Sequence, residues 1–249
     1  MIRPRTASLP LALVVVAIAL AGCASSLEHF RVYEVDKIEA SFEVRLTDQF
    51  DPAAKDAKTL ELTHFANPSR KVHGGTSAGV NHPDRHFTWY SLSQAQPEPR
   101  RTVRFRNQFG QHSVDIRDPR FLLVPAQKTS HAGSAFPTGL DHYKCYEVVN
   151  VNTAPPLPVV TLGDQFGLQQ NAQVGKPVLF CPPVKKERAG QPAAAIVNAA
   201  DHLAVYELPP LPQTVAIKIK DQFGDRNLQV VQSVRLVVPT VKQAVVAHP

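Results

Sequence analysis

The phrase Asp164-Gln165-Phe166-Gly167 recurs in this chain as Asp221-Gln222-Phe223-Gly224, as Asn107-Gln108-Phe109-Gly110 and as Asp48-Gln49-Phe50-Asp51. Apolar and polar side chains alternate before each copy, and this period of two predicts a strand with one buried face. The glycine can adopt φ > 0, and the Asp or Asn can accept a backbone hydrogen bond. The phrase therefore predicts a strand end and a turn, with the phenylalanine pointing inward.

Two further landmarks keep register with this phrase. Each copy opens on a histidine followed four residues later by a tyrosine: His29 and Tyr33, His86 and Tyr90, His142 and Tyr146, His202 and Tyr206. Each copy closes on an apolar run that ends in proline: Pro68, Pro125, Pro182 and Pro239. The histidines are 57, 56 and 60 residues apart, which is the spacing of an internal structural repeat.

The repeats predict an all-β fold, because each unit supplies several short strands and no clear helical pattern. One unit of about 57 residues buries too little surface to be stable alone. We therefore expect the repeats to pair into two β-sandwich or barrel-like domains. Repeats 1 and 2 would form residues 28–130, repeats 3 and 4 would form residues 141–249, and residues 131–140 would link them.

The first 22 residues are typical of a signal peptide. A basic start with Arg3 and Arg5 precedes an apolar run over residues 11–20, and small residues follow. The run is too short for a comfortable transmembrane helix, which needs about 20 residues. Leu20-Ala21-Gly22-Cys23 matches the lipobox of bacterial lipoproteins. This motif predicts lipid modification of Cys23, with residues 23–27 as a tether, and the residues after Cys23 favour the outer membrane.

Two other cysteines remain, Cys145 and Cys181, and both lie in repeat 3. When the repeats are aligned on their closing prolines, apolar residues occupy most of the corresponding positions, as expected for neighbouring buried sites. Exported compartments are oxidising. We therefore predict a Cys145–Cys181 disulfide.

The four repeat histidines His29, His86, His142 and His202 raise the question of metal binding or pH sensing. Ligand sets need convergent residues, and no short fixed spacing provides them here. We expect each imidazole to hydrogen-bond a neighbouring strand or turn, and the repeat tyrosines to be structural as well. A weak surface metal site at His73 and His82, which flank Gly74-Gly75, is the alternative.

Composition and motifs argue against several functional classes. The net charge of +6 falls to +4 once Arg3 and Arg5 are removed, and it forms no basic stripe of the kind that nucleic-acid binders carry. The sequence contains no nucleophile elbow, phosphate-binding glycine loop or zinc-protease motif. We expect neither an enzyme nor a cofactor.

Repeat 3 resembles an uncharacterised family of exported bacterial repeat domains. The resemblance rests on residues 142–146, 164–167 and 174–186, which match H-Y-x-C-Y, D-Q-F-G and V-G-K-P-x-L-x-C-x-P-V-x-K. Repeat 4 matches moderately, and repeats 1 and 2 match only in outline. The resemblance implies secretion and a paired-cysteine repeat, and it brings no known activity.

Two functional classes therefore remain. We expect a lipid-anchored, non-catalytic binding module of the cell envelope, whose partner is a glycan or an envelope protein. The alternative is a structural or accessory subunit of an envelope assembly. Exposed apolar residues that occur once, such as Phe136 or the neighbourhood of Trp89, would favour a ligand site.

Overall fold

The computed structural model describes residues 27–94, 97–130 and 134–248, and it confirms the all-β prediction. These residues form β-strands joined by turns and irregular segments. The strands are β1 (Phe30–Thr47), β2 (Lys55–Pro68), β3 (Arg70–His73), β4 (Thr76–Ala78), β5 (His86–Gln94), β6 (Arg101–Asn107), β7 (Gly110–Lys128), β8 (His142–Thr153), β9 (Val159–Asp164), β10 (Gly167–Gln173), β11 (Pro177–Cys181), β12 (Pro183–Glu187), β13 (His202–Asp221) and β14 (Gly224–Ala247).

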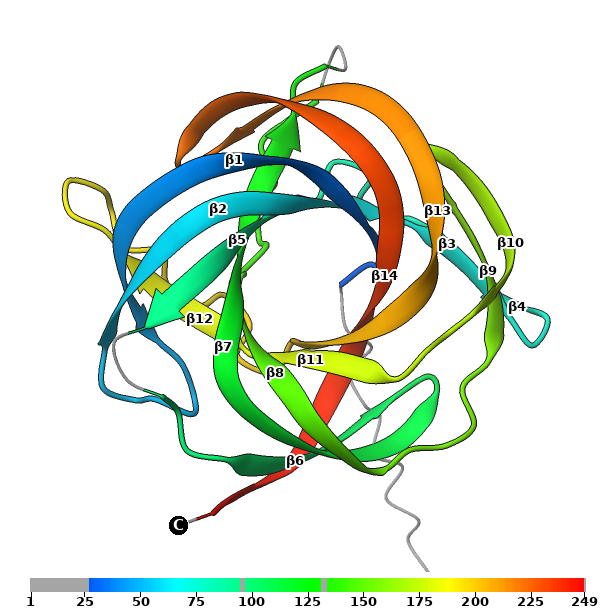
Figure 1. Cartoon of the computed structure of the whole chain (residues 1–249), viewed down its shortest axis with the longest axis horizontal. Coiled ribbons are helices and arrows are strands. Elements are labelled where there is room, and N and C mark those ends of the chain that lie inside the picture. Colours follow the sequence, from blue (N-terminus) through cyan, green and yellow to red (C-terminus); the bar gives the residue numbers. More distant parts are fainter. Residues whose placement is uncertain (1–26, 95–96, 131–133, 249) are drawn as a thin grey trace, which may run out of the picture.

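The centre of the molecule is a closed barrel to which all four repeats contribute (Figure 1). Each repeat gives its opening strand, which begins near the histidine, and its closing strand, which leads to the proline or passes through it. These strands pair antiparallel in chain order, β1–β2–β5–β7–β8–β11–β13–β14. β14 then pairs with β1, so the last repeat closes the ring onto the first.

Beyond the tyrosine, each repeat extends into a hairpin that folds back along the outside of the barrel. Its tip pairs with the segment after the closing proline of the repeat two places along. The four pairings are β1 with β12, β6 with the end of β14, β9 with β3, and β13 with the end of β7. Hairpins therefore connect repeat 1 with repeat 3, and repeat 2 with repeat 4.

The hairpin turns form as the sequence predicts. In every repeat the backbone N–H of the phenylalanine donates to the side-chain oxygen of the Asp or Asn two residues earlier, over 2.7 to 2.9 Å. Gly110, Gly167 and Gly224 have φ of 114°, 127° and 124°, where glycine is favoured. Phe109 and Phe223 are buried, whereas Phe50 and Phe166 are half-buried and pack against the edges of hydrophobic clusters, so all four turns point the phenylalanine inward.

Three hydrophobic clusters follow from this arrangement. One fills the barrel lumen with residues from all four repeats, among them Phe30, Phe87, Tyr143 and Leu203. The other two lie between the hairpins and the outer face of the barrel strands. Side chains alternate along each opening strand, so the residue after the histidine enters the lumen while the tyrosine faces the hairpins.

The two halves predicted as separate domains, residues 28–130 and 141–249, share this one barrel. β7 pairs with β8 across the predicted boundary, and β14 pairs with β1. Alternation of apolar residues defines the buried face of a strand but not its neighbour, and only ring closure leaves no edge strand unpaired. Within the predicted linker 131–140, the described residues 134–140 form a loop before β8, and the last of them, Leu140, is buried in the lumen cluster.

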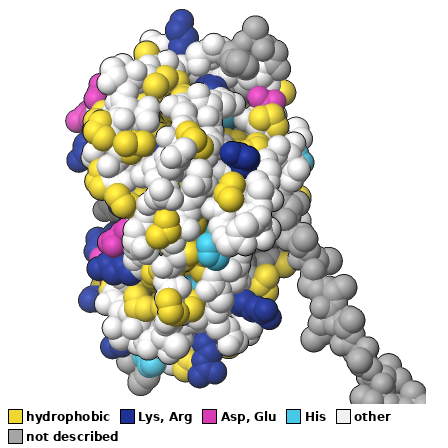
Figure 2. All heavy atoms as spheres, turned by 90° about the vertical axis from the view of Figure 1, so that its right-hand side faces the viewer, with side chains coloured by type: hydrophobic (Ala, Val, Ile, Leu, Met, Phe, Trp, Pro, Cys, Tyr) yellow, Lys and Arg dark blue, Asp and Glu magenta, His cyan; other side chains and the backbone are white. Residues whose placement is uncertain are grey.

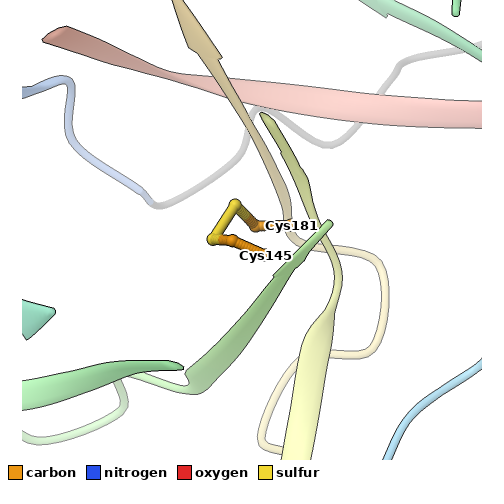
Figure 3. Close-up of a disulfide and its surroundings, with 2 residues drawn as sticks. All are labelled: Cys145 and Cys181. Carbon is orange, nitrogen blue, oxygen red and sulfur yellow. A yellow bond between two sulfur atoms is a disulfide. The ribbon is translucent and has the colours of Figure 1, made fainter. Parts of the chain in front are cut away.

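The predicted disulfide between Cys145 and Cys181 is present. The two cysteines lie on adjacent strands, β8 and β11, and their side chains meet on the same side of the sheet (Figure 3). The register corrects the alignment on Pro182, because Pro183 is the residue opposite Tyr143, as Pro68 is opposite Phe30. The true counterparts of Cys181 are therefore Ala66, Leu123 and Val237, which all line the lumen.

Candidate functional site

The most repeated side chains of the sequence meet at the junctions between repeats. Each tyrosine hydroxyl contacts the turn Asp or Asn of the repeat opposite: Tyr33 to Asp164, Tyr90 to Asp221, Tyr146 to Asp48, and Tyr206 to Asn107, over 2.5 to 2.7 Å. The three carboxylates accept a hydrogen bond from the tyrosine hydroxyl, whereas the Asn107 amide donates one to the Tyr206 oxygen. Burial raises the pKa of Tyr33, Tyr90, Tyr146 and Tyr206, so the hydroxyls stay neutral donors.

The histidines contact the turn glutamine of a neighbouring repeat, as predicted for a structural role. Gln108 pairs with His29, Gln222 with His142, and Gln49 with His202, each through the histidine Nε2. Burial lowers the pKa of His29 and His142 to about 3 and that of His202 to about 4, so these rings are neutral. A neutral ring can accept the glutamine N–H, and a protonated ring cannot.

His86 departs from this pattern. Its expected partner, Gln165, instead donates to the Pro83 carbonyl at 3.5 Å. Within the described part of the chain, neither ring nitrogen of His86 has a hydrogen-bond partner, although the residue is almost fully buried. The ring stacks on Phe65, with 5.3 Å between the centroids, and burial lowers the pKa of His86 to about 3.

Residues directly before the histidines fix the connectors between repeats. Glu28 accepts the backbone N–H groups of Asn81 and His82, both over 3.0 Å. Asp141 accepts those of the corresponding residues in the third connector, Val197 and Asn198. In repeat 2 the acid is replaced by Arg85, and the matching connector residue is Pro137, which has no N–H to donate. The change of acceptor thus coincides with the loss of one of the two donors.

A ring of lysines accompanies these contacts. Three residues after each structurally equivalent proline (Pro68, Pro125, Pro183 and Pro239) stand Lys71, Lys128, Lys186 and Lys242. Three of the ammonium groups lie over the turn phenylalanine of the next repeat, at 4.9 Å for Lys71 and Phe109, 5.2 Å for Lys128 and Phe166, and 4.9 Å for Lys186 and Phe223. This spacing is visible in the sequence under either alignment, because Lys185 stands three residues after Pro182 and Lys186 three residues after Pro183.

A cluster of buried charges marks the junction of repeats 1 and 3. Lys144 is fully buried, and its Nζ lies 2.9 Å from Asp51, 3.6 Å from Asp48 and 3.9 Å from Glu98. Arg101 and Lys55 contact the same carboxylates. Burial alone would raise the pKa of Asp51, but the hydrogen bonds and charges of Lys55 and Lys144 hold it well below its usual range. The cluster balances three acids against three bases.

The remaining predicted site residues lie apart from one another. Trp89 is buried in the lumen, so it offers no surface, whereas Phe136 is exposed. His73 packs edge-on against Phe109, while His82 bonds Glu28 at 2.9 Å. In the described segments, no three His, Cys, Asp or Glu side chains converge as metal ligands. Cys23 lies outside the described residues.

Two surface properties complete the picture. On the face that carries β9, β10 and β13, hydrophobic side chains are scattered in small groups among polar and backbone atoms (Figure 2). No helix within residues 27–94, 97–130 and 134–248 has the length and apolar character to cross a bilayer.

The fold and its junctions define a closed, four-repeat all-β protein. The chain belongs to the family described as a repeat of unknown function (DUF7450), whose model matches residues 86–239. The match begins at the repeat histidine His86 and ends at the closing proline Pro239, so it spans repeats 2, 3 and 4 in full. No curated protein and no solved structure matches the chain.

Proposed function

We propose that this protein is a lipid-anchored, non-catalytic binding module of the bacterial cell envelope, held at the outer membrane through Cys23. The observation that carries the proposal is the use of the repeated polar side chains. The histidines, tyrosines, glutamines and turn acids contact one another between repeats. Such residues build a scaffold, and recognition is left to surface residues that occur once.

The course of the chain supports an orientation for this scaffold. Leu27 packs into the lumen cluster, and only four Cα–Cα steps separate it from Cys23. Four steps span at most about 15 Å. The described parts of the three connectors, residues 74–85, 134–141 and 188–201, lie at the same end of the barrel as Leu27, which we call the connector end. Lipid on Cys23 would therefore hold the connector end against the bilayer.

Exposed apolar residues on the connectors fit that orientation. Phe136 is 43% exposed in the second connector, and Val197 is 69% exposed in the third. Val197 is held close to the barrel rim, because its N–H donates to Asp141 over 2.6 Å. Aromatic and aliphatic side chains at a membrane-facing rim insert favourably among lipid headgroups.

The opposite end of the barrel, which we call the far end, would then face the partner. Strands bend there into the hairpins, and the pairing of β1 with β2 shifts register twice near the bend. A cavity of about 360 Å³ lies between β2, β5 and β7, lined by Leu60, Leu92, Pro97, Pro119 and Arg120 among others. Leu60 is 42% exposed, although it is apolar. We propose this cavity as the contact for an envelope protein or glycan.

Membrane attachment is tested by detergent partitioning and by the mass of the N-terminal peptide. Native protein should partition into detergent and carry acyl chains on Cys23, whereas Cys23→Ala protein should stay in the aqueous phase. Aqueous partitioning of the native protein would contradict the anchor.

Partner binding is tested by crosslinking in whole cells. We expect Leu60→Lys to reduce recovery of the crosslinked partner at least tenfold. Val246→Lys, at an exposed apolar position on β14 that does not line this cavity, should leave recovery unchanged. Equal recovery from both variants would contradict a far-end contact. A single protein recovered in stoichiometric amount would instead favour the subunit of an envelope assembly.

A further inference from the structure

Lys71 has an environment that its three counterparts do not share. It is 2% exposed, and its Nζ donates to Gln108 Oε1 and lies 4.9 Å above the Phe109 ring. Gln108 in turn donates to His29, which burial keeps neutral by lowering its pKa. The two groups that contact the ammonium group, the Gln108 amide and the Phe109 ring, are therefore uncharged.

The other buried lysines of the ring have carboxylates nearby. Asp164 and Asp84 raise the pKa of Lys128 against the larger effect of burial, and Asp221 does the same for Lys186. The fourth lysine, Lys242, is partly exposed to water. At the Lys71 junction the turn residue is Asn107, so the repeated carboxylate is replaced by an amide.

The replacement of the carboxylate by an amide makes the charged form of the buried Lys71 side chain less favourable. Burial lowers the pKa of Lys71 to about 8, and no neighbouring carboxylate in the described part of the chain opposes that shift. The group is therefore still mainly protonated at neutral pH. A buried ion without an opposite charge is unfavourable, and a bound counter-ion would relieve the penalty.

A cavity lies directly against this cation. It has a volume of about 200 Å³ and is lined by Lys71, His73, Thr76, Ala78 and Gln108. A tight turn at Gly74 and Gly75, with φ of 54° and 75°, brings β4 back beside β3 to form one wall. Thr76 and Gln108 are exposed, so the cavity is open to solvent, whereas Lys71 lies buried at its base.

The lining suits an anion and disfavours a metal ion. Lys71, the Thr76 hydroxyl and the Gln108 amide supply N–H and O–H donors, and no acidic residue lines the cavity. A volume of about 200 Å³ corresponds to roughly six water molecules at about 30 Å³ each. That space holds a tetrahedral oxyanion together with some of its hydration.

We propose that this cavity is a binding site for a phosphate-sized oxyanion, whose charge takes the place of the carboxylate that the other turns of the repeat provide. The ion would lie against Lys71 Nζ, with Thr76 as a second donor. This site is independent of the far-end contact proposed above, because it lies at the junction of repeats 1 and 2 beside β3 and β4.

The test is calorimetric titration of the full chain with inorganic phosphate at constant ionic strength, with chloride as the compensating salt. We expect measurable phosphate binding by the native protein. Lys71→Met should weaken it at least tenfold. Lys242→Met, at the equivalent but partly exposed position, should change it less than twofold. Absence of phosphate heat above the chloride background, or equal affinity in Lys71→Met, would overturn the proposal.

A second variant keeps the test valid if Lys71→Met does not fold. Asn107→Asp restores the carboxylate that three repeats already carry, and the Tyr206 hydroxyl can donate to it as Tyr33, Tyr90 and Tyr146 do in their repeats. The restored carboxylate should displace phosphate and reduce its affinity at least tenfold. Unchanged phosphate affinity in Asn107→Asp would show that Lys71 does not need a counter-charge.

Discussion

At the position after each histidine the lumen holds Phe30, Phe87, Tyr143 and Leu203, whereas three residues further along the outward-facing residue is tyrosine in all four repeats. The second lumen position varies as widely, with Val32, Trp89, Cys145 and Val205. Outside the barrel, the histidine, glutamine and phenylalanine are also the same in every repeat. The repeats have thus diverged inside the barrel and stayed alike in the layer around it.

This difference follows from what each region requires. A lumen filled by side chains needs the correct total volume, and different residues can share that volume if they pack without strain. A hydrogen bond between a tyrosine and a carboxylate needs one donor at one distance. The outer layer therefore sets how each hairpin lies on the barrel, while the lumen supplies most of the apolar burial.

The largest expected difference is in acid, which should destabilise the protein through the histidines of the outer layer and not through the apolar side chains of the lumen. The pKa values of His29, His86 and His142 are lowered to about 3, below the unfolded value of 6.5, so the unfolded chain binds more protons. Stability is present above pH 6.5 and is lost as the pH falls from 6.5 toward 3. Each histidine contributes a slope of up to about 1.4 kcal/mol per pH unit. Urea unfolding at pH 7.5, 6 and 5 measures this loss.

A matched pair of variants sharpens that test. His29→Gln should flatten the pH dependence by one proton, and Val237→Ala in the lumen should lower stability without changing the slope. Equal slopes in both variants would mean that the histidines of the outer layer do not carry the acid sensitivity.

Removal of Lys144 should cause the next largest loss in the free energy of unfolding. Lys144→Ala leaves Asp48, Asp51 and Glu98 close together in a buried site, and breaking a buried ion pair in this way costs about 3–5 kcal/mol. Adding Asp51→Gly should recover part of the loss, because repeat 4 has Ala204 and Gly224 at these positions. Chemical unfolding of the single and double variants gives the coupling free energy between Lys144 and Asp51. Simple additivity of the two costs would contradict a charge network.

Removal of the disulfide tests how much the lumen depends on a covalent link in addition to packing. Cys145→Val with Cys181→Ala reproduces the pair Val32 and Ala66 of repeat 1, so the packing of a natural repeat replaces the covalent link. Closing a loop of this length contributes about 3–4 kcal/mol in the chain-entropy model. We expect that loss of stability with the fold retained. A reductant should destabilise the native protein and leave the double variant unaffected. Loss of strand content in the double variant would show that repeat 3 cannot rely on packing.

The smallest expected losses of stability come from substitutions of two tyrosines of the outer layer. Tyr33→Phe removes a donor from the buried carboxylate of Asp164 and should cost about 1.5–3 kcal/mol. Tyr206→Phe removes an acceptor from the neutral Asn107 amide, which keeps Thr240 as a second partner, and also removes the 3.1 Å contact with His112 Nε2. Both lost contacts are between neutral groups, and we expect a combined cost of about 1–2 kcal/mol. Both costs come from urea unfolding at pH 7.5. Equal costs would show that the carboxylate gives the contact no additional strength.

Local features were predictable from the sequence, and long-range partners were not. The Asp164 turn, the inward Phe109 and the Cys145–Cys181 pair follow from spacing and residue chemistry within one repeat. The contact between Tyr33 and Asp164 crosses from repeat 1 to repeat 3, and alternation of apolar residues carries no information about that choice. The one-residue error at Pro182 gave Cys181 the wrong counterparts, because two consecutive prolines give no sign of which one matches the closing proline of the other repeats.

The contact between each tyrosine and the turn of the repeat opposite has a consequence for how such a protein can change in size. In a ring of four, every repeat has a counterpart two places along. These contacts are reciprocal, since repeats 1 and 3 exchange them and so do repeats 2 and 4. A ring of three or five cannot be divided into such reciprocal pairs and would have a different curvature. Duplication or loss of a single repeat therefore breaks the closure, so copy number in this architecture is restricted in a way that open solenoids, which grow one unit at a time, are not.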